Sequence, residues 1–449
     1  MKKVRSFLIL TIVMLLMVTS FVGCQNAQET QAPEVKAAEE TQVAEEDTSG
    51  GLTPRTVVDR EDATEGISLT PTSYTEAQLP GVPYVGAIPE KKYKIAFSNG
   101  DMANDWRASF FNSMVAGGEY LNEQFGIEFI YANSGADSAK QLQDIQSMLA
   151  QQPDILLFSP NESAPLTPVA DMCEELGIPF ITVDRAIDAV VGEGMYLSNI
   201  EGDNFKAGVA MGLELVRGLT EKNGTAQGNV AEITGAIGST PAIQRSAGVR
   251  HVLKDYPEIK IIQVIDGKWD AEAAYQGAQD IFTTNGADLD ALVCSFDSGT
   301  MQAITVAEIQ GMQDLIYVSS DADSTFLKDY VLEGKAFSCC EYPPYYDVTA
   351  LEYAIHYLNG NDIPQNVLLA QRLFNTSTDA KKEALVELTN MTSSNGDPFI
   401  PAGYGMYDIF DMTGEMWDKY YPVNWVEAGG ADYLATLIPA DPFALWNVE

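Results

Sequence analysis

The sequence predicts an α/β protein made of two doubly wound lobes, each a mostly parallel sheet with helices on both faces. From residue 91 onward, short β-branched apolar runs alternate with amphipathic stretches of helical length. The same alternation begins again after residue 199, so the chain holds two successive series of βα units. Repeated units of this length need a parallel sheet that is covered on both faces. A chain of 449 residues is long enough for two such lobes with substantial cores.

The first series is organised around an apolar run, Ile181-Thr182-Val183, that ends on Asp184 and Arg185. This run follows a Gly-Ile-Pro turn and is typical of a buried parallel strand. Polar residues that follow such a strand point into the crevice where open α/β sheets bind ligands. The predicted elements of this series are strands at 93–97, 127–131, 155–158 and 178–183, and helices at 105–125, 138–151 and 166–176.

The second series repeats the pattern and then continues into a less regular end. Its predicted helices are 205–219, 242–254, 271–283, 300–309 and 326–332, and its strands are 229–234, 259–264, 289–295 and 315–319. A strand at 336–340, a helix at 345–358 closed by Asn359-Gly360, and a strand at 367–370 follow. Beyond a helix at 379–388, the segment to residue 449 is rich in aromatic residues, which favours ordered packing on the body.

The N-terminus has the layout of a secretory signal at residues 1–23, with early cations followed by an apolar run. Its end, Val22-Gly23-Cys24, resembles a bacterial lipobox, in which Cys24 is lipidated and becomes the first mature residue. A plain signal peptide and an uncleaved anchor are the alternatives, and all three readings export the chain. Residues 24–90 lack a helical or strand period, so we expect an acidic linker.

Composition excludes several classes of partner. The net charge of −38 repels phosphate backbones and anionic lipid headgroups, so we expect no nucleic acid partner. The cysteines after the leader show no C-x-x-C spacing, so the sequence disfavours a metal site and favours buried free thiols, with a disulfide as the alternative. These cysteines are Cys173, Cys294, Cys339 and Cys340.

Polar and aromatic side chains fall at the ends of several predicted strands, where they suit a neutral polyol. Carboxylates and guanidinium groups make charge-assisted hydrogen bonds to hydroxyls, and indole rings cover the C–H faces of a sugar. Each residue also has a plainer reading, since an Asp before a helix is commonly an N-cap and a Trp can simply pack. Because all of them fall at the same edge of a sheet, we predict a site between the lobes, formed by Asn104, Trp106, Arg107, Asp184, Arg185, Arg245, Trp269, Asp297, Asp321 and Glu341.

Five separated segments resemble the ligand-contact segments of periplasmic sugar-binding proteins of the ribose/galactofuranose type. The resemblance covers about residues 91–377 and implies a solute receptor of an ABC importer with the type I periplasmic binding protein fold. It implies lobes at 91–199 plus 342–370 and 200–341 plus 371–378, joined by three crossings, with an extension at 379–449. The segments are 104–107, 183–188, 239–248, 267–270 and 341–344.

The resemblance also implies a role for each site residue. Asp184 and Asp321 would accept hydrogen bonds from sugar hydroxyls, and Glu341 would lie at the hinge. Three arginines would donate to sugar oxygens, and two indoles would enclose the ring; these residues are Arg107, Arg185, Arg245, Trp106 and Trp269. The chain departs from the family pattern at Phe296-Asp297, where many members have Asn-Asp, and in the length of its extension.

We therefore expect a monomeric, lipid-anchored receptor on the outer face of the bacterial cell membrane that binds a sugar and delivers it to ABC permease subunits. It would need no cofactor, and its only contact with the membrane would be the lipid. A co-receptor of a membrane sensor kinase is the alternative. An enzyme is disfavoured because no nucleophile elbow or phosphate loop appears, and His251 and His356 fall within predicted helices. The identity of the sugar stays open.

Overall fold

The computed structural model describes most of the chain from residue 88 onward. The predicted signal peptide, Cys24 and all but the last residues of the linker lie outside the described residues, as does much of the C-terminal extension. Among the helices that the structure describes, none combines the length and apolar character needed to span a bilayer. The described residues are 88–312, 314–369, 371–390, 399, 407–410, 412, 419–420, 437–439 and 441–446.

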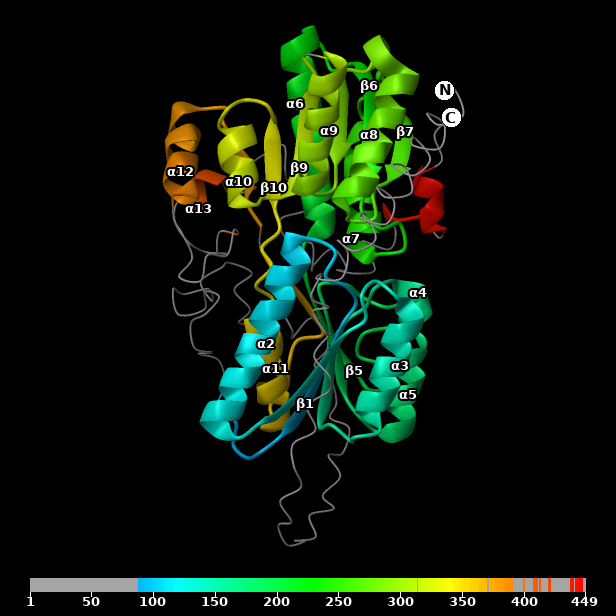
Figure 1. The fold of residues 1–449 in the computed structure, drawn as a ribbon, viewed down its shortest axis with the longest axis vertical. Coiled ribbons are helices and arrows are strands. Elements are labelled where there is room, and N and C mark those ends of the chain that lie inside the picture. Colours follow the sequence, from blue (N-terminus) through cyan, green and yellow to red (C-terminus); the bar gives the residue numbers. More distant parts are fainter. Residues whose placement is uncertain are drawn as a thin grey trace, which may run out of the picture. The chain divides into compact units, whose positions relative to one another are not determined.

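The first lobe is a six-stranded parallel sheet with the strand order β11-β5-β4-β3-β1-β2. Helices α2 and α11 cover one face, and α3, α4 and α5 cover the other (Figure 1). The strands are β1 (Lys94–Asn99), β2 (Glu128–Asn133), β3 (Ile155–Ser159), β4 (Phe180–Val183), β5 (Tyr196–Gly202) and β11 (Asn366–Leu369). The helices are α2 (Asp105–Phe125), α3 (Ser138–Leu149), α4 (Ser163–Leu166), α5 (Pro168–Leu176) and α11 (Asp347–Leu358).

The second lobe is a six-stranded sheet with the order β12-β10-β9-β8-β6-β7, parallel except for β12, which runs antiparallel to β10. Its strands are β6 (Gly228–Thr234), β7 (Ile259–Asp266), β8 (Ala291–Cys294), β9 (Ile316–Asp321), β10 (Ser338–Glu341) and β12 (Leu373–Asn375). Its α-helices are α6 (Asn204–Asn223), α7 (Thr240–Leu253), α8 (Ala271–Asn285), α9 (Asp297–Gln310) and the short α10 (Ser324–Phe326). The 3-10 turn η4 (Gly286–Asp288) follows α8, and the π-helical turn η5 (Leu327–Val331) follows α10.

The order of the strands shows that the chain passes between the two sheets three times. The passages follow β5, β10 and β11. Strand β5 extends to Gly202, three residues beyond the lobe boundary that the sequence predicts at 199. The α/β class with two doubly wound sheets is confirmed.

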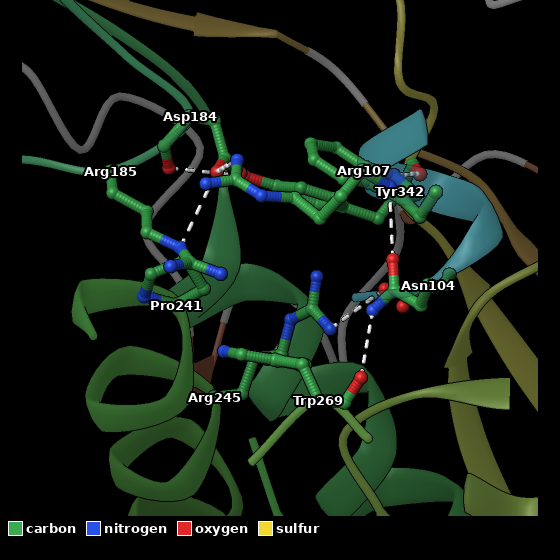
Figure 2. Close-up of a pocket in the computed structure, with 10 residues that line it drawn as sticks. Asn104, Arg107, Asp184, Arg185, Pro241, Arg245, Trp269 and Tyr342 are labelled. Carbon is green, nitrogen blue, oxygen red and sulfur yellow. Dashed lines mark hydrogen bonds and ion pairs between the residues drawn. The ribbon is translucent and has the colours of Figure 1, made fainter. Parts of the chain in front are cut away.

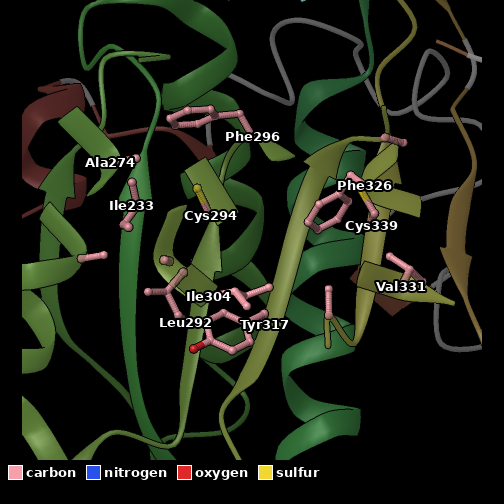
Figure 3. Close-up of a cluster of buried hydrophobic side chains, with 14 of the residues drawn as sticks. Ile233, Ala274, Leu292, Cys294, Phe296, Ile304, Tyr317, Phe326, Val331 and Cys339 are labelled. Atoms are coloured by element: carbon pink, nitrogen blue, oxygen red, sulfur yellow. The ribbon is translucent and has the colours of Figure 1, made fainter. Parts of the chain in front are cut away.

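Each sheet is enclosed by apolar clusters that fix the positions of its strand ends. In the second lobe, α8 and α9 pack against one face of the sheet. They bury side chains of the strands and loops there, such as those of Ile233, Leu292 and Phe296 (Figure 3). Cys294 and Cys339 belong to the same cluster, and all four described cysteines are buried free thiols, in agreement with the prediction. Burial raises the pKa of the Cys294 thiol to about 12, so this thiol stays protonated and packs as an apolar group.

The described residues of the C-terminal extension pack on the body of the protein. Helix α12 (Asp379–Thr389) is followed by α13 (Tyr407–Phe410), whose Phe410 ring lies 5.0 Å from that of Phe374 in the second lobe. The 3-10 turn η6 (Pro442–Trp446) lies against α7, and Trp446 Nε1 donates to Ser246 Oγ at 3.2 Å. Phe399 contacts both lobes: it is buried in the core of the first, and its backbone forms a β-bridge with Asp323 of the second.

Candidate functional site

A pocket lies where loops at the carboxyl ends of the strands of both sheets come together (Figure 2). With its mouth it encloses about 280 Å³ of space. Its lining residues are Asn104, Trp106, Arg107, Asp184, Arg185, Pro241, Arg245, Trp269, Asp321 and Tyr342.

The N-terminus of α2 presents the first group of these side chains. Asn104 is the N-cap, and its Oδ1 accepts a hydrogen bond from the backbone N–H of Arg107 at 2.9 Å. Trp106 and Arg107 therefore lie in the first helical turn, and both are buried. Trp106 is fixed by a hydrogen bond of 2.6 Å from its indole Nε1 to the carbonyl oxygen of Tyr342. The cap thus holds an indole and a guanidinium group at one wall of the pocket.

Asp184 directly follows β4 and adopts a left-handed backbone conformation with φ of 67°. Arg107 Nη1 donates to its Oδ2 at 2.6 Å, and the hydroxyl of Tyr342 donates to its Oδ1 at 2.9 Å. Arg107 Nη1 also donates to Ser159 Oγ at 2.9 Å, at the end of β3. The carboxylate is therefore held from two sides, and it faces the pocket as a hydrogen-bond acceptor.

Arg185 completes the charged wall of the first lobe, and the Asp101 carboxylate lies directly behind that wall. Arg185 Nη1 donates to the carbonyl oxygen of Asn161 at 2.7 Å and lies 3.3 Å from Asp101 Oδ2. The same carboxylate oxygen accepts from Arg107 Nε at 3.2 Å. Burial alone would raise the pKa of Asp101, but Arg107 and Arg185 beside it hold the pKa below its ordinary value. Asp101 is thus a buried anion between two cations.

The second lobe supplies Arg245 from α7. Its Nη1 donates to Asp321 Oδ1 at 2.9 Å and to the carbonyl oxygen of Ser295, and its Nε donates to Asn204 Oδ1 at 3.0 Å. The guanidinium carbon lies 4.5 Å from the ring centre of Tyr342, which is a favourable cation–π distance. Arg245 is therefore fixed in place by partners from three other segments of the chain.

Trp269 and Asp321 both adopt left-handed backbone conformations, with φ of 59° and 89°. Non-glycine residues in this region are uncommon and cluster at functional sites. Trp269 is held by a hydrogen bond of 3.1 Å from its Nε1 to Ser239 Oγ, and its ring lies over Gly235. Burial raises the pKa of Asp321 to about 6, although Arg245 lowers it. The local strain thus orients an indole and a carboxylate toward the pocket.

Two of the ten predicted site residues do not line the pocket. The Asp297 carboxylate accepts hydrogen bonds from the backbone N–H groups of Ser298 and Asp323, at 2.6 and 2.7 Å, and so fixes the start of α9 against the loop after β9. The Glu341 carboxylate pairs with Arg372, whose Nε donates at 2.7 Å. Because neither carboxylate lines the pocket, these hydrogen bonds stabilise the second lobe and its last passage.

Sequence reasoning missed three residues of the site. Tyr342 lies directly after β10 and touches Asp184, Trp106 and Arg245, but a tyrosine at a crossing is also typical of core packing. Pro241 begins the helix that carries Arg245. The only sequence signal for Asp101 is its position two residues after β1.

The described residues contain no group of three or more His, Cys, Asp and Glu side chains that could hold a metal ion. The polar groups that converge on the pocket are carboxylates, guanidinium groups, one amide and one phenol. Such a set binds by hydrogen bonds to hydroxyls and ring oxygens, while the indole and phenol rings offer apolar faces.

Comparison with known proteins gives a consistent result. Residues 95–362 match the family model described as a periplasmic binding protein domain. The galactofuranose-binding protein YtfQ of Escherichia coli (strain K12) is 26% identical over 294 residues, which are 64% of this chain and 89% of that protein. The ribose import binding protein RbsB of Bacillus subtilis (strain 168) is 20% identical over 278 residues, which are 62% of this chain and 86% of that protein.

A solved structure has the same fold. The periplasmic binding protein component of the arabinose ABC transporter from Shewanella sp. ANA-3, bound to α- and β-L-arabinofuranose, superposes with a TM-score of 0.58 at 23% identity. The superposition covers 66% of this chain and 94% of that one.

Proposed function

Since this chain belongs to the family of periplasmic binding proteins, we propose that it binds a neutral monosaccharide in the pocket between its lobes and delivers it to the permease of an ABC importer. The observation that carries the proposal is the convergence of carboxylates, guanidinium groups and aromatic rings from both lobes on one small pocket. The names of the relatives support a sugar as ligand, because those proteins bind galactofuranose, ribose and arabinofuranose.

The first-lobe wall has hydrogen-bond donors to offer a sugar. Arg107 uses its Nε and Nη1 within the protein, but its buried Nη2 has no partner among the described residues. A buried guanidinium N–H without a partner is costly, so a ligand oxygen that accepts from it is stabilising. We assign this Nη2 to a sugar hydroxyl or ring oxygen.

The acceptors and the rings account for the rest of the ligand. Each carboxylate oxygen has more than one acceptor site, so Asp184 can accept from sugar hydroxyls while it keeps Arg107 and Tyr342 as partners. Asp321 supplies a second carboxylate from the opposite lobe. The indoles of Trp106 and Trp269 pack against the C–H faces of the ring.

Contacts from both lobes link binding to closure. A ligand that touches Asp184 in one lobe and Arg245 in the other interacts fully only when the lobes are together, so it shifts the population toward the closed form. Several charge-assisted hydrogen bonds in a buried site are consistent with micromolar or tighter affinity, about −8 kcal/mol or better.

Cys24 carries a lipid that holds a monomeric receptor on the outer face of the bacterial cell membrane, and residues 24–90 tether the lobes to it. The partners are permease subunits, and the sugar leaves unchanged. Incubating the protein with each candidate sugar and recovering it intact supports binding without catalysis. Mass spectrometry of the wild-type protein and of Cys24→Ala tests the lipid, because only the wild-type protein should carry the added mass of the lipid.

A thermal-shift screen against a panel of aldoses and pentoses tests the function itself, because a ligand that binds only the native state raises the melting midpoint. We expect at least one sugar to raise it, and Asp184→Ala to abolish that rise. Asp144→Ala, on the surface of α3, is the matched control. A folded wild-type protein that responds to no sugar, or an Asp184→Ala variant that binds normally, would contradict the proposal.

A further inference from the structure

Asp101 lies behind the wall of the pocket and does not line it. It is 4% exposed, and its Oδ1 is held by the backbone N–H of Ala103 at 3.1 Å. Its Oδ2 lies 3.2 Å from Arg107 Nε and 3.3 Å from Arg185 Nη1. One buried carboxylate oxygen therefore bridges two guanidinium groups that come from different elements of the first lobe.

The charges around the pocket balance only when Asp101 is included. The lining contains three guanidinium groups, those of Arg107, Arg185 and Arg245, but only two carboxylates, those of Asp184 and Asp321. The lining alone thus carries one excess positive charge, which Asp101 neutralises from behind. An unpaired buried charge is costly, so this balance matters to any ligand that enters.

We propose that Asp101 is a positioning and specificity-determining residue that makes the pocket select neutral sugars over sugar acids. The inference rests on the proposed function. With Asp101 present, a sugar carboxylate that enters the pocket loses its hydration, while each guanidinium group that it meets is already paired with a carboxylate. The cost of desolvation is then not compensated, so the pocket excludes sugar acids. Without Asp101, Arg107 and Arg185 share Asp184 as their nearest carboxylate, and the unpaired guanidinium becomes a site for an anion.

The test compares Asp101→Asn with the wild-type protein by calorimetry and thermal shift. The probes are matched pairs in which a carboxylate replaces an alcohol or aldehyde: D-galactose with D-galacturonate, D-glucose with D-glucuronate, and D-ribose with D-ribonate. We expect the ratio of acid to neutral affinity to rise by about tenfold or more in at least one pair. A folded variant with unchanged ratios in all pairs overturns the proposal, since a merely structural residue would weaken both members equally.

Two control variants isolate the effect of the charge. Asp144→Asn removes one negative charge from a partly exposed position on α3, where Asp144 pairs with Lys140, and it should leave every ratio unchanged. Asp101→Glu keeps the charge and should keep the preference for neutral sugars. A wild-type protein that binds none of the neutral sugars contradicts the proposed function instead. If the wild-type protein binds no neutral sugar, binding of a sugar acid by Asp101→Asn alone still supports a role of Asp101 in selectivity. Failure of Asp101→Asn to bind any sugar acid overturns that role.

The design also covers a variant that does not fold without ligand. In that case millimolar sugar acid should restore the folded state of Asp101→Asn, while the matched neutral sugar should not. Equal rescue by both members of a pair overturns the proposal. The double variant Asp101→Asn with Arg185→Gln restores the balance of charges, so it should fold and again prefer neutral sugars; a double variant that prefers acids also overturns the proposal.

Discussion

Asn104 and Trp269 join the two lobes directly beside the pocket: the side-chain Nδ2 of Asn104 donates to the carbonyl oxygen of Trp269 at 2.9 Å. The same Asn104 side chain caps α2 through its Oδ1. One amide therefore orders the helix that presents Trp106 and Arg107, and it also fastens that helix to the opposite lobe. These two tasks use different atoms, so a substitution can separate them.

Asn104→Asp should keep the cap and lose the link between the lobes. A carboxylate accepts from the Arg107 N–H as an amide oxygen does, but it cannot donate to the Trp269 carbonyl. We expect a larger radius of gyration of the ligand-free protein in small-angle X-ray scattering and a roughly fivefold to tenfold loss of sugar affinity. The melting midpoint should change little. Asp137→Asn, at the cap of α3, is the control, and an unchanged scattering profile of Asn104→Asp would show that the link does not hold the lobes together.

Gly235→Ala should disturb Trp269 without touching the ligand. A Cβ at position 235 would lie 2.0 Å from two atoms of the Trp269 ring, so the indole has to move. We expect sugar affinity to fall by about tenfold or more, with the quenching of Trp269 fluorescence on binding reduced. At Gly238 the nearest atoms to a new Cβ belong to the Glu162 side chain at 3.2 Å, which can shift, so Gly238→Ala is the matched control. Equal sugar affinities of Gly235→Ala and Gly238→Ala would show that Trp269 does not contact the sugar.

Much of this site was predictable because the carboxyl ends of parallel strands meet at one edge of a sheet. Asp184-Arg185 and Asp321 follow or end buried strands, and that position alone brings them to the pocket. Strand β5 was missed because Ser198, Asn199 and Glu201 make it look polar. In the fold the side chain of Asn199 is paired, since Thr182 Oγ1 donates to its Oδ1 at 2.8 Å.

Asp297 and Glu341 could not be separated from the pocket residues by position in the sequence. They occupy strand ends as Asp184 does, but their oxygens are taken by the backbone N–H of Asp323 and by Arg372. These partners lie 26 and 31 residues away, and no local pattern indicates such pairings. Asp101 was missed for the converse reason, because its importance comes from two distant arginines rather than from its neighbours.

Sugar affinity should depend on pH through Asp321. Burial raises the pKa of Asp321 to about 6 from its ordinary value of 3.8, so below about pH 6 the carboxylate gains a proton and can no longer accept hydrogen bonds at both oxygens. Affinity should therefore fall as the pH is lowered from 7 to 5, whereas Asp321→Asn should bind weakly at every pH. Calorimetry from pH 5 to 7 measures the affinity. A wild-type affinity that does not change over this range would show that the Asp321 carboxylate does not contact the sugar.

The raised pKa of Asp321 also makes the free energy of unfolding depend on pH. The folded protein keeps this proton up to about pH 6, whereas the unfolded chain loses it near 3.8. The contribution of Asp321 to the free energy of unfolding is thus present at low pH and is lost as the pH rises through this window. Urea denaturation at pH 4 and pH 7, with Asp321→Asn as the comparison, measures this contribution.

Phe399→Ala should destabilise the protein, because the ring of Phe399 is 4% exposed and belongs to the core cluster of the first lobe. Its backbone contacts, the bridge to Asp323 and the carbonyl oxygen that accepts from the Tyr345 hydroxyl at 3.0 Å, do not need the side chain. Loss of a buried phenyl group costs roughly 3–5 kcal/mol in the free energy of unfolding, measurable by urea denaturation. Val386→Ala, on the exposed face of α12, should cost less than about 0.5 kcal/mol. If the two variants unfold at the same urea concentration, the extension is not anchored in the first lobe through Phe399.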